Sequence, residues 1–241
     1  MEAKDVSLIG PSNGLMFAQK IYDLPTHQKC LNEAGANAVE LVMYLGEERR
    51  QKTLLSGKLN AAFISVHLDD YYPDKPLHVQ ILPAKNIFDR HKARAAVIHP
   101  VENPEFYYEA LMTAGIPVAI ENMDKAKPHG HAKWELWHLI EKCHLKFVLD
   151  VQHAFDHDSG MAYAWDLFQM AGPDLVYLHV SGQNEKSIHS LVHLAENSTA
   201  IIHFLGKVFS ERKLPIILEG QYTTALEVKT EIEFIKKELG F

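Results

Sequence analysis

The sequence predicts an α/β fold, a single-domain (β/α)8 or TIM barrel covering residues 1–241. Three observations lead to this prediction. The chain has 241 residues, close to the ~250 that such a barrel needs. Short apolar runs recur along it, and each is rich in β-branched residues and too short for a helix, which is typical of parallel strands buried on both faces. Segments with helical periodicity lie between these runs, and the alternation favours a parallel barrel.

Eight apolar runs are predicted to be strands. In chain order they are Val6–Ile9, Ala38–Tyr44, Ala61–Val66, Ala95–Ile98, Pro117–Ile120, Lys146–Leu149, Leu175–Leu178 and Pro215–Leu218. An open, doubly wound sheet is the alternative arrangement. It would need a G-x-G-x-x-G motif after the first strand, and only IGPSNG is found there.

Five segments are predicted to be helices. They are Asn103–Ala114, His131–Cys143, Met161–Met170, Leu191–Arg212 and Ala225–Leu239. The first begins at an Asn-Pro start signal and ends before Gly115. Trp134, Trp137 and Trp165 are expected to pack these helices against the barrel.

Composition limits the partners and the compartment. Asp and Glu number 31 against 24 Lys and Arg, a formal charge of −7 that disfavours non-specific nucleic-acid binding. The two cysteines, Cys30 and Cys143, do not form a disulfide framework, so a reducing compartment is expected. Residues 1–7 lack the apolar stretch of a signal peptide, and no apolar run is long enough to span a membrane. A cytoplasmic protein is therefore expected.

Six of the eight runs end at a side chain that can bind a metal ion. These strand-end residues are His67, His99, Glu121, Asp150, His179 and Glu219. The carboxyl ends of barrel strands converge on one mouth, where carboxylates repel one another unless cations neutralise them. Three carboxylates and three imidazoles without a thiolate suit Zn, Mn or Fe. One such residue more often caps a helix, but six in matching positions predict a site for one or two divalent ions.

Other polar residues near the predicted strand ends have alternative roles. His153 follows Asp150 by three residues and could reach a metal ion or a substrate oxygen. His189 and His193 are spaced for one face of a helix. Glu40 lies in the second strand, where it could either cap the mouth or pair with an Arg or Lys.

Together these motifs resemble those of the xylose isomerase-like barrels, the group that contains sugar isomerases and epimerases as well as endonuclease IV. The resemblance runs from the second-strand motif GANAVEL to the eighth-strand motif ILEG. Between them, VAIEN is similar to the fifth-strand Glu motif, VLDVQHAF to the Asp-x-x-His motif after the sixth strand, and YLHVSG to the seventh-strand motif. Their order is fairly specific to the superfamily, though not to one reaction.

The isomerase and epimerase branch implies one Mn-type ion. Its ligands would be Glu121, Asp150, His179 and Glu219. The two glutamates would also serve as the acid and the base at the sugar carbons, and His153 would bind substrate oxygens.

The endonuclease branch implies a larger metal centre. His67 and His99 would join the ligands, Glu121 would bridge two ions, and His153 would help to hold a third. The presence of both His67 and His99 favours a site for two ions.

Two features depart from the endonuclease pattern. The third metal of that branch needs an Asp-x-His after the seventh strand, whereas Lys186 and Ile188 stand there, followed by His189. The loop YLGEERRQK does not resemble the DNA-inserting loop of the family, although it supplies two arginines. A complete trinuclear zinc centre is therefore not expected.

The sequence thus predicts a divalent-metal-dependent enzyme. The preferred function is a sugar or sugar-phosphate isomerase or epimerase that moves a proton with the help of the metal. An endonuclease IV-like phosphoester hydrolase and a metal-binding barrel without catalysis remain alternatives. The expected partner is a small polyol or sugar; nucleic acid is disfavoured and no membrane is expected.

Overall fold

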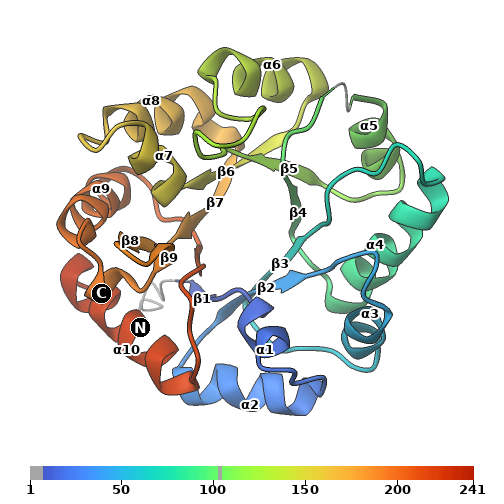
Figure 1. The fold of residues 1–241 in the computed structure, drawn as a ribbon, viewed down its shortest axis with the longest axis horizontal. Helices are drawn as coiled ribbons and strands as arrows, with labels where there is room; N and C mark the ends of the chain where they lie inside the picture. Colours follow the sequence, from blue (N-terminus) through green and yellow to red (C-terminus); the bar gives the residue numbers. More distant parts are fainter. Residues whose placement is uncertain (1–7, 103–104) are drawn as a thin grey trace, which may run out of the picture.

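The computed structural model describes residues 8–102 and 105–241, and it has the predicted (β/α)8 barrel (Figure 1). Eight parallel strands form one sheet in the order β1-β10-β7-β6-β5-β4-β3-β2. These strands are β1 (Ile9–Pro11), β2 (Ala38–Val42), β3 (Phe63–His67), β4 (Ala95–Ile98), β5 (Val118–Glu121), β6 (Lys146–Asp150), β7 (Leu175–Val180) and β10 (Ile216–Leu218). Every predicted strand run overlaps one of them; the start of the first run, Val6 and Ser7, lies outside the described residues.

Helices surround the sheet (Figure 1). The longer ones are α2 (Leu24–Ala34), α3 (Glu48–Leu55), α4 (Leu77–His91), α5 (Glu105–Thr113), α6 (Lys133–Cys143), α8 (Ala162–Ala171), α9 (Ser198–Glu211) and α10 (Ala225–Leu239). Two short helices, α1 (Gly14–Ala18) and α7 (Val151–His157), directly follow strands β1 and β6. The predicted start signal of α5, Asn103 and Pro104, lies outside the described residues. In the described part of the chain, no helix has the length and apolar character to cross a membrane.

The predicted helix Leu191–Arg212 is wrong in its first part. A 3₁₀ turn, η2 (Val192–Leu194), comes first, and α9 begins only at Ser198. The physical reason is the buried carboxylate of Glu231, which accepts hydrogen bonds from the backbone amides of Val192 and His193 and from the His193 ring. These bonds satisfy the amides at the start of the turn and fix it against α10.

A hairpin precedes this turn, which the sequence prediction also missed. It consists of β8 (Gly182–Asn184) and β9 (Ser187–Ser190), paired antiparallel. His189 therefore lies on a strand and His193 in a 3₁₀ turn. The predicted sharing of one helix face by these two histidines is wrong.

The tryptophans of α6 do not pack as expected. The face of α6 toward the barrel carries Leu136, Leu139 and Ile140, at helical spacing. Trp134 and Trp137 lie outside that face and are 75% and 48% exposed. Trp165, on α8, is partly buried and stacks on Phe168.

The barrel closes between β1 and β2 through a seam rather than a full strand ladder. The two strands share one isolated bridge, between Ser12 and Glu40. Side chains supply further bonds: Oδ1 of Asn37 accepts from the backbone amide of Ile9, and Oδ1 of Asn13 accepts from that of Val42, each at 2.8 Å.

Gly10 lies at the tightest point of this seam. A Cβ atom built on Gly10 would lie 1.8 Å from the carbonyl oxygen of Ala38. Only glycine allows the two backbones to approach so closely.

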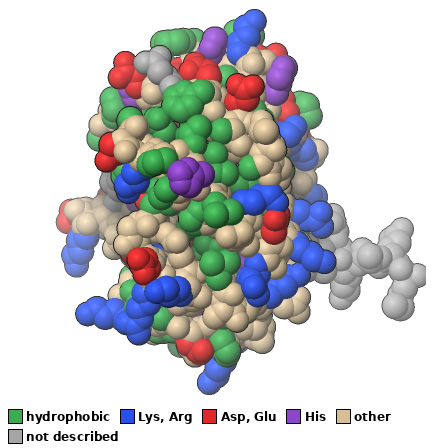
Figure 2. Space-filling view, turned by 90° about the vertical axis from the view of Figure 1, so that its right-hand side faces the viewer, with side chains coloured by type: hydrophobic (Ala, Val, Ile, Leu, Met, Phe, Trp, Pro, Cys, Tyr) green, Lys and Arg blue, Asp and Glu red, His purple; other side chains and the backbone are tan. Residues whose placement is uncertain are grey.

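The outer face formed by α4 and α5 carries a cluster of hydrophobic side chains (Figure 2). The exposed apolar residues of these helices are Val79, Leu82 and Phe106, at 44%, 58% and 48% exposure. This face is on the helical exterior and does not line the barrel mouth.

Candidate metal centre

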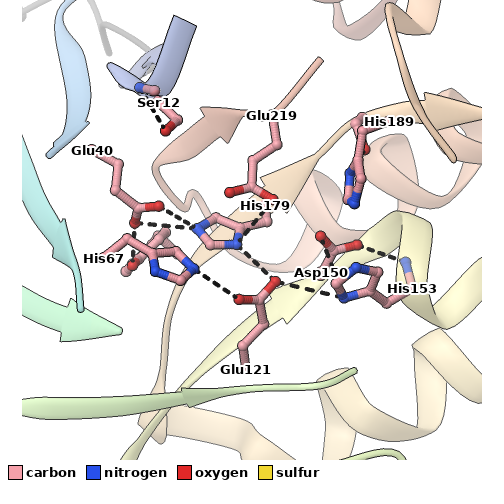
Figure 3. Close-up of polar contacts among 12 residues, drawn as sticks. Ser12, Glu40, His67, Glu121, Asp150, His153, His179, His189 and Glu219 are labelled. Atoms are coloured by element: carbon pink, nitrogen blue, oxygen red, sulfur yellow. Dashed lines mark hydrogen bonds and ion pairs between the residues drawn. The ribbon is translucent and has the colours of Figure 1, made fainter. Parts of the chain in front are cut away.

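The mouth of the barrel brings together the side chains predicted from the strand ends (Figure 3). The largest group with ligand atoms within 4.8 Å of one another consists of Glu121, Asp150, His179 and Glu219. Three further groups of this kind overlap it: His67 with His99 and Glu121; Asp150 with His153 and His189; and Glu40 with His67 and Glu219. All seven residues expected as metal ligands thus lie at one mouth.

The end of β6 holds Asp150 in a defined position. Its Oδ1 accepts a hydrogen bond of 2.6 Å from the amide of His153 and so caps α7. The side-chain amide of Asn122 pairs with the backbone of Asp150 in both directions, each bond 2.8 Å long. Oδ2 of Asp150 is buried and accepts no hydrogen bond from the described residues.

His179 lies at the centre of the site, with a carboxylate at each ring nitrogen. Nδ1 is 2.9 Å from Glu121, and Nε2 is 3.1 Å from Glu40. Carboxylates only accept hydrogen bonds, so both ring nitrogens donate. Burial alone would lower the pKa of His179, but the three surrounding glutamates, the third being Glu219, raise it well above its ordinary value.

Glu40 is fully buried in the middle of β2. Its Oε2 accepts hydrogen bonds from the hydroxyls of Ser65 at 2.9 Å and Tyr177 at 2.7 Å. Its third partner is His179, so of the two alternatives for Glu40, pairing with an Arg or Lys is not found among the described residues. Burial raises the pKa of Glu40, but the nearby His179 charge outweighs it and the net shift is downward.

His67 and His99 approach the same oxygen. Nε2 of each ring is 3.7 Å from Oε2 of Glu121. Nδ1 of His67 donates to the carbonyl of Leu68 at 3.0 Å, and Nδ1 of His99 lies 3.0 Å from Asp70. These outer contacts fix the rings so that Nε2 faces the mouth. Burial would lower the pKa of His67, but the neighbouring glutamates raise it to about 9.

His153 and His189 form the third group with Asp150. Nδ1 of His153 donates to the carbonyl of Asn122 at 2.9 Å, and the two histidine rings lie 5.3 Å apart. The β8–β9 hairpin delivers His189, whose Nδ1 is 3.0 Å from the hydroxyl of Ser181. Sequence reasoning placed His189 on a helix and so did not bring it to this site.

Glu219 differs from the other carboxylates. Its side chain is 18% exposed. Burial raises the pKa of Glu219 to about 8, against the opposing effect of His179 and with support from the negative charges of Glu121 and Asp150. A carboxyl group with this pKa can both take up and release a proton near neutral pH.

The donor set fits a divalent metal ion. Within residues 8–102 and 105–241, no Lys or Arg is paired with the four carboxylates at the mouth. Oδ2 of Asp150 accepts no hydrogen bond from the described residues, with Nδ1 of His153 3.7 Å away, and Asp150 belongs to this cluster. Carboxylate and imidazole donors in this ratio suit Mn, Zn or Fe.

Two cavities open beside Glu219. One has a volume of about 680 Å³ and extends over His189, Gln221 and Thr223. The other has a volume of about 470 Å³ and extends over His67 toward α3. Both volumes lie in the range of small-molecule binding sites.

Comparison with known proteins supports the fold. No family model matches the chain, and no curated protein sequence matches it significantly. Among solved structures, a D-tagatose 3-epimerase-like protein is 17% identical, with a TM-score of 0.68 over 98% of this chain and 97% of that one. A xylose isomerase domain-containing protein from Salmonella typhimurium is 14% identical, with a TM-score of 0.63 and 98% of both chains covered.

A third similar structure is D-psicose 3-epimerase from Clostridium cellulolyticum H10. It is 10% identical, with a TM-score of 0.60 over 90% of this chain and 94% of that one. The expected resemblance to xylose isomerase-like barrels is therefore confirmed for the fold. Identities this low carry no specific activity over to this chain.

Proposed function

We propose that this chain is a divalent-metal-dependent enzyme that isomerises or epimerises a sugar or sugar phosphate. The observation that carries the proposal is the position of Glu121 and Glu219. Glu121 ends β5 and Glu219 directly follows β10, and both approach Nδ1 of His179, at 2.9 and 3.5 Å, with a substrate-sized cavity beside Glu219 (Figure 3). The names of the similar structures, two of them sugar epimerases or similar to one, agree with this chemistry.

The residues that would hold the metal are Glu121, Asp150, His179 through Nδ1, and Glu219. When bound, a divalent ion acts as a Lewis acid that makes the proton on the carbon next to a carbonyl easier to remove. Glu40 accepts the hydrogen bond from Nε2 of His179, so Nδ1, which in this structure donates to Glu121, would be the nitrogen that gives up its proton and holds the metal.

Proton transfer falls to the two glutamates. One glutamate removes the proton from the substrate carbon, and the other supplies a proton to the opposite face; Glu219, with a pKa of about 8, can take up and release a proton near neutral pH. His153, whose Nδ1 proton is held by Asn122, orients the substrate oxygens.

Deuterium exchange from heavy water into a panel of ketoses and ketose phosphates tests this proposal. Glu219→Gln should lose at least about 100-fold in the exchange rate, since general acid–base groups contribute that much. His138→Ala is the matched control, because His138 is exposed on α6. A metal-loaded wild-type protein that exchanges no proton on any member of the panel would contradict the proposal.

Phosphoester hydrolysis is a second candidate, and the His67–His99–Glu121 group favours it. This group shares Glu121 with the four-residue group, so two ions bound here would lie close together, as in two-metal hydrolases. The double change His67→Ala with His99→Ala should lower the metal content from two ions to one. A hydrolase would then stop cleaving an abasic-site oligonucleotide, whereas an isomerase centred on the other four residues would keep measurable exchange. If the metal-loaded protein shows neither proton exchange nor cleavage, a metal-binding barrel without catalysis would be favoured.

A further inference from the structure

The smaller cavity has chemically different ends. One end is formed by Glu219 and His67, which belong to the metal centre. The other end is lined by Lys20 and Arg50, together with the aromatic rings of Tyr22, Tyr44 and Phe17. A ligand that fills this cavity would therefore touch the metal centre and two cations at once.

Arg50 is held in a fixed position at this end. It lies in the first turn of α3 and is only 8% exposed. Its guanidinium carbon is 4.5 Å from the ring centre of Phe17 and 4.4 Å from that of Tyr44. Contacts with two rings restrict the plane of the guanidinium before any ligand arrives, so less freedom is lost on binding.

The charge at this end is not fully balanced. Glu47, 3.0 Å from Nε of Arg50, is the one carboxylate paired with Arg50 among the described residues, and its side chain is 42% exposed. Across residues 8–102 and 105–241, no carboxylate pairs with Lys20. Two cations thus face one partly solvated anion, which favours a ligand with negative charge.

The larger cavity provides an internal comparison. It also reaches Glu219 and His189, but the rest of its polar lining comes from neutral groups such as Gln19, Gln221 and Thr223, and no Lys or Arg is among the lining residues that the structure describes. Lys20 and Arg50 are therefore gathered on one side of the mouth only. The uncharged side suits hydroxyl groups, and the cationic side suits an anion.

We propose that Arg50, assisted by Lys20, binds the phosphate group of a phosphorylated sugar or polyol whose other end lies at Glu219. A planar guanidinium can bind two phosphate oxygens at once, and an ammonium adds a point charge. The inference rests on the proposed function of the same mouth and narrows its substrates to phosphate monoesters.

Binding measurements on the chelator-treated protein test the phosphate site without the metal. Inorganic phosphate is titrated into wild type, Arg50→Gln, Arg50→Lys and Lys20→Gln by calorimetry. Arg50→Gln should weaken phosphate binding by roughly 10- to 100-fold, the value of hydrogen bonds to charged groups. Arg50→Lys should weaken it by less, because the charge remains. Arg49→Gln is the matched control, since Arg49 is the adjacent, exposed arginine and does not line the cavity.

A second titration uses the Mn-loaded protein with D-fructose and with its phosphate ester at the terminal carbon. The ester should bind at least about 10-fold more tightly in wild type, and Arg50→Gln should remove that preference. Equal affinity for sugar and ester, or equal losses in the Arg49 and Arg50 variants, would overturn the inference. If Arg50→Gln fails to fold, Lys20→Gln is the deciding variant. Lys20 is exposed, and its replacement must still weaken phosphate binding. Phosphate binding without proton exchange on any ketose would overturn the proposed function and leave this site standing.

Discussion

Among single residues, Glu40 has the clearest supporting role. Its carboxylate accepts hydrogen bonds from Ser65, Tyr177 and His179. A carboxylate that accepts the outer N–H of a metal-binding histidine fixes the orientation and the tautomer of the ring. Glu40 is therefore a positioning residue that acts through His179.

Replacing Glu40 with Gln should weaken metal binding by about 10- to 100-fold, the usual cost of losing such a partner. Competition with a fluorescent chelator measures the affinity, and nitrogen NMR of His179 reports which ring nitrogen carries the proton. Ser65→Ala is the control, because it removes one bond to Glu40 and leaves His179 paired. Unchanged affinity together with an unchanged tautomer in Glu40→Gln would show that the pair is only structural.

The ligand candidates themselves give a second prediction. Asp150→Asn and Glu121→Gln should each lose most of the bound metal, since each removes an anionic donor from the central group. His138→Ala, on the outer surface of α6, should keep the wild-type metal content. Elemental analysis of protein purified without chelator measures this, and equal metal content in all three variants would place the site elsewhere.

The sequence predicted the strand-end residues but not their partners. His67, Asp150 and Glu219 could be found because a strand end in a parallel barrel always faces the mouth. The role of Glu40 depends on the register of β2 against β3 and on the distance across the barrel to Tyr177, which no local pattern records. His189 was missed because it reaches the site from a short hairpin.

At the level of elements, the strands were easier to predict than the segments after β7. Continuous apolar runs indicate buried parallel strands whatever surrounds them. The β8–β9 hairpin has only three or four residues in each strand, and the turn η2 is fixed by Glu231 from α10. Both depend on contacts with residues far along the chain. The helical periodicity of the sequence therefore led to a predicted helix that wrongly included η2.

The seam between β1 and β2 gives a prediction at this scale. Gly10→Ala should destabilise the protein by at least about 1–3 kcal/mol, because the added methyl group would meet the backbone of Ala38. Gly46→Ala is the control, since a Cβ there meets no atom within 4 Å. Urea unfolding of the two variants gives the comparison, and equal midpoints would show that the seam can widen without cost.

Across the whole molecule, the charged groups at the mouth make stability depend on pH when the metal is removed. The pKa values of His67 and His153 are raised to about 9. Their contribution to the free energy of unfolding is therefore complete below about pH 6.5 and is lost as the pH rises through 9. Glu219 has a pKa of about 8 when folded against 4.5 as the ordinary value, so its contribution also falls as the pH rises between these values.

Chelator-treated protein should therefore melt at a lower temperature at pH 9 than at pH 6. Glu219→Gln should show a smaller decrease, because the amide cannot ionise. The melting temperature of the metal-loaded protein should also decrease less between pH 6 and pH 9, since metal ligands bind in their deprotonated forms. Thermal unfolding followed by circular dichroism tests these points, and a melting temperature that rises with pH in the chelated protein would contradict them.

The pairing of β1 with β10 has a consequence for the order in which a nascent chain can fold. Ile9 leaves the ribosome long before its ladder partner Ile216 is made, because most of the barrel lies between them in the chain. Before β10 emerges, β1 has one bridge to β2, and the far edge of β7 has no strand beside it. A ribosome-bound chain with seven of the eight strands therefore exposes two open strand edges, the condition in which unfinished sheets associate with other chains. β10, the last of these eight strands in chain order, is the one that protects the edges of both β1 and β7.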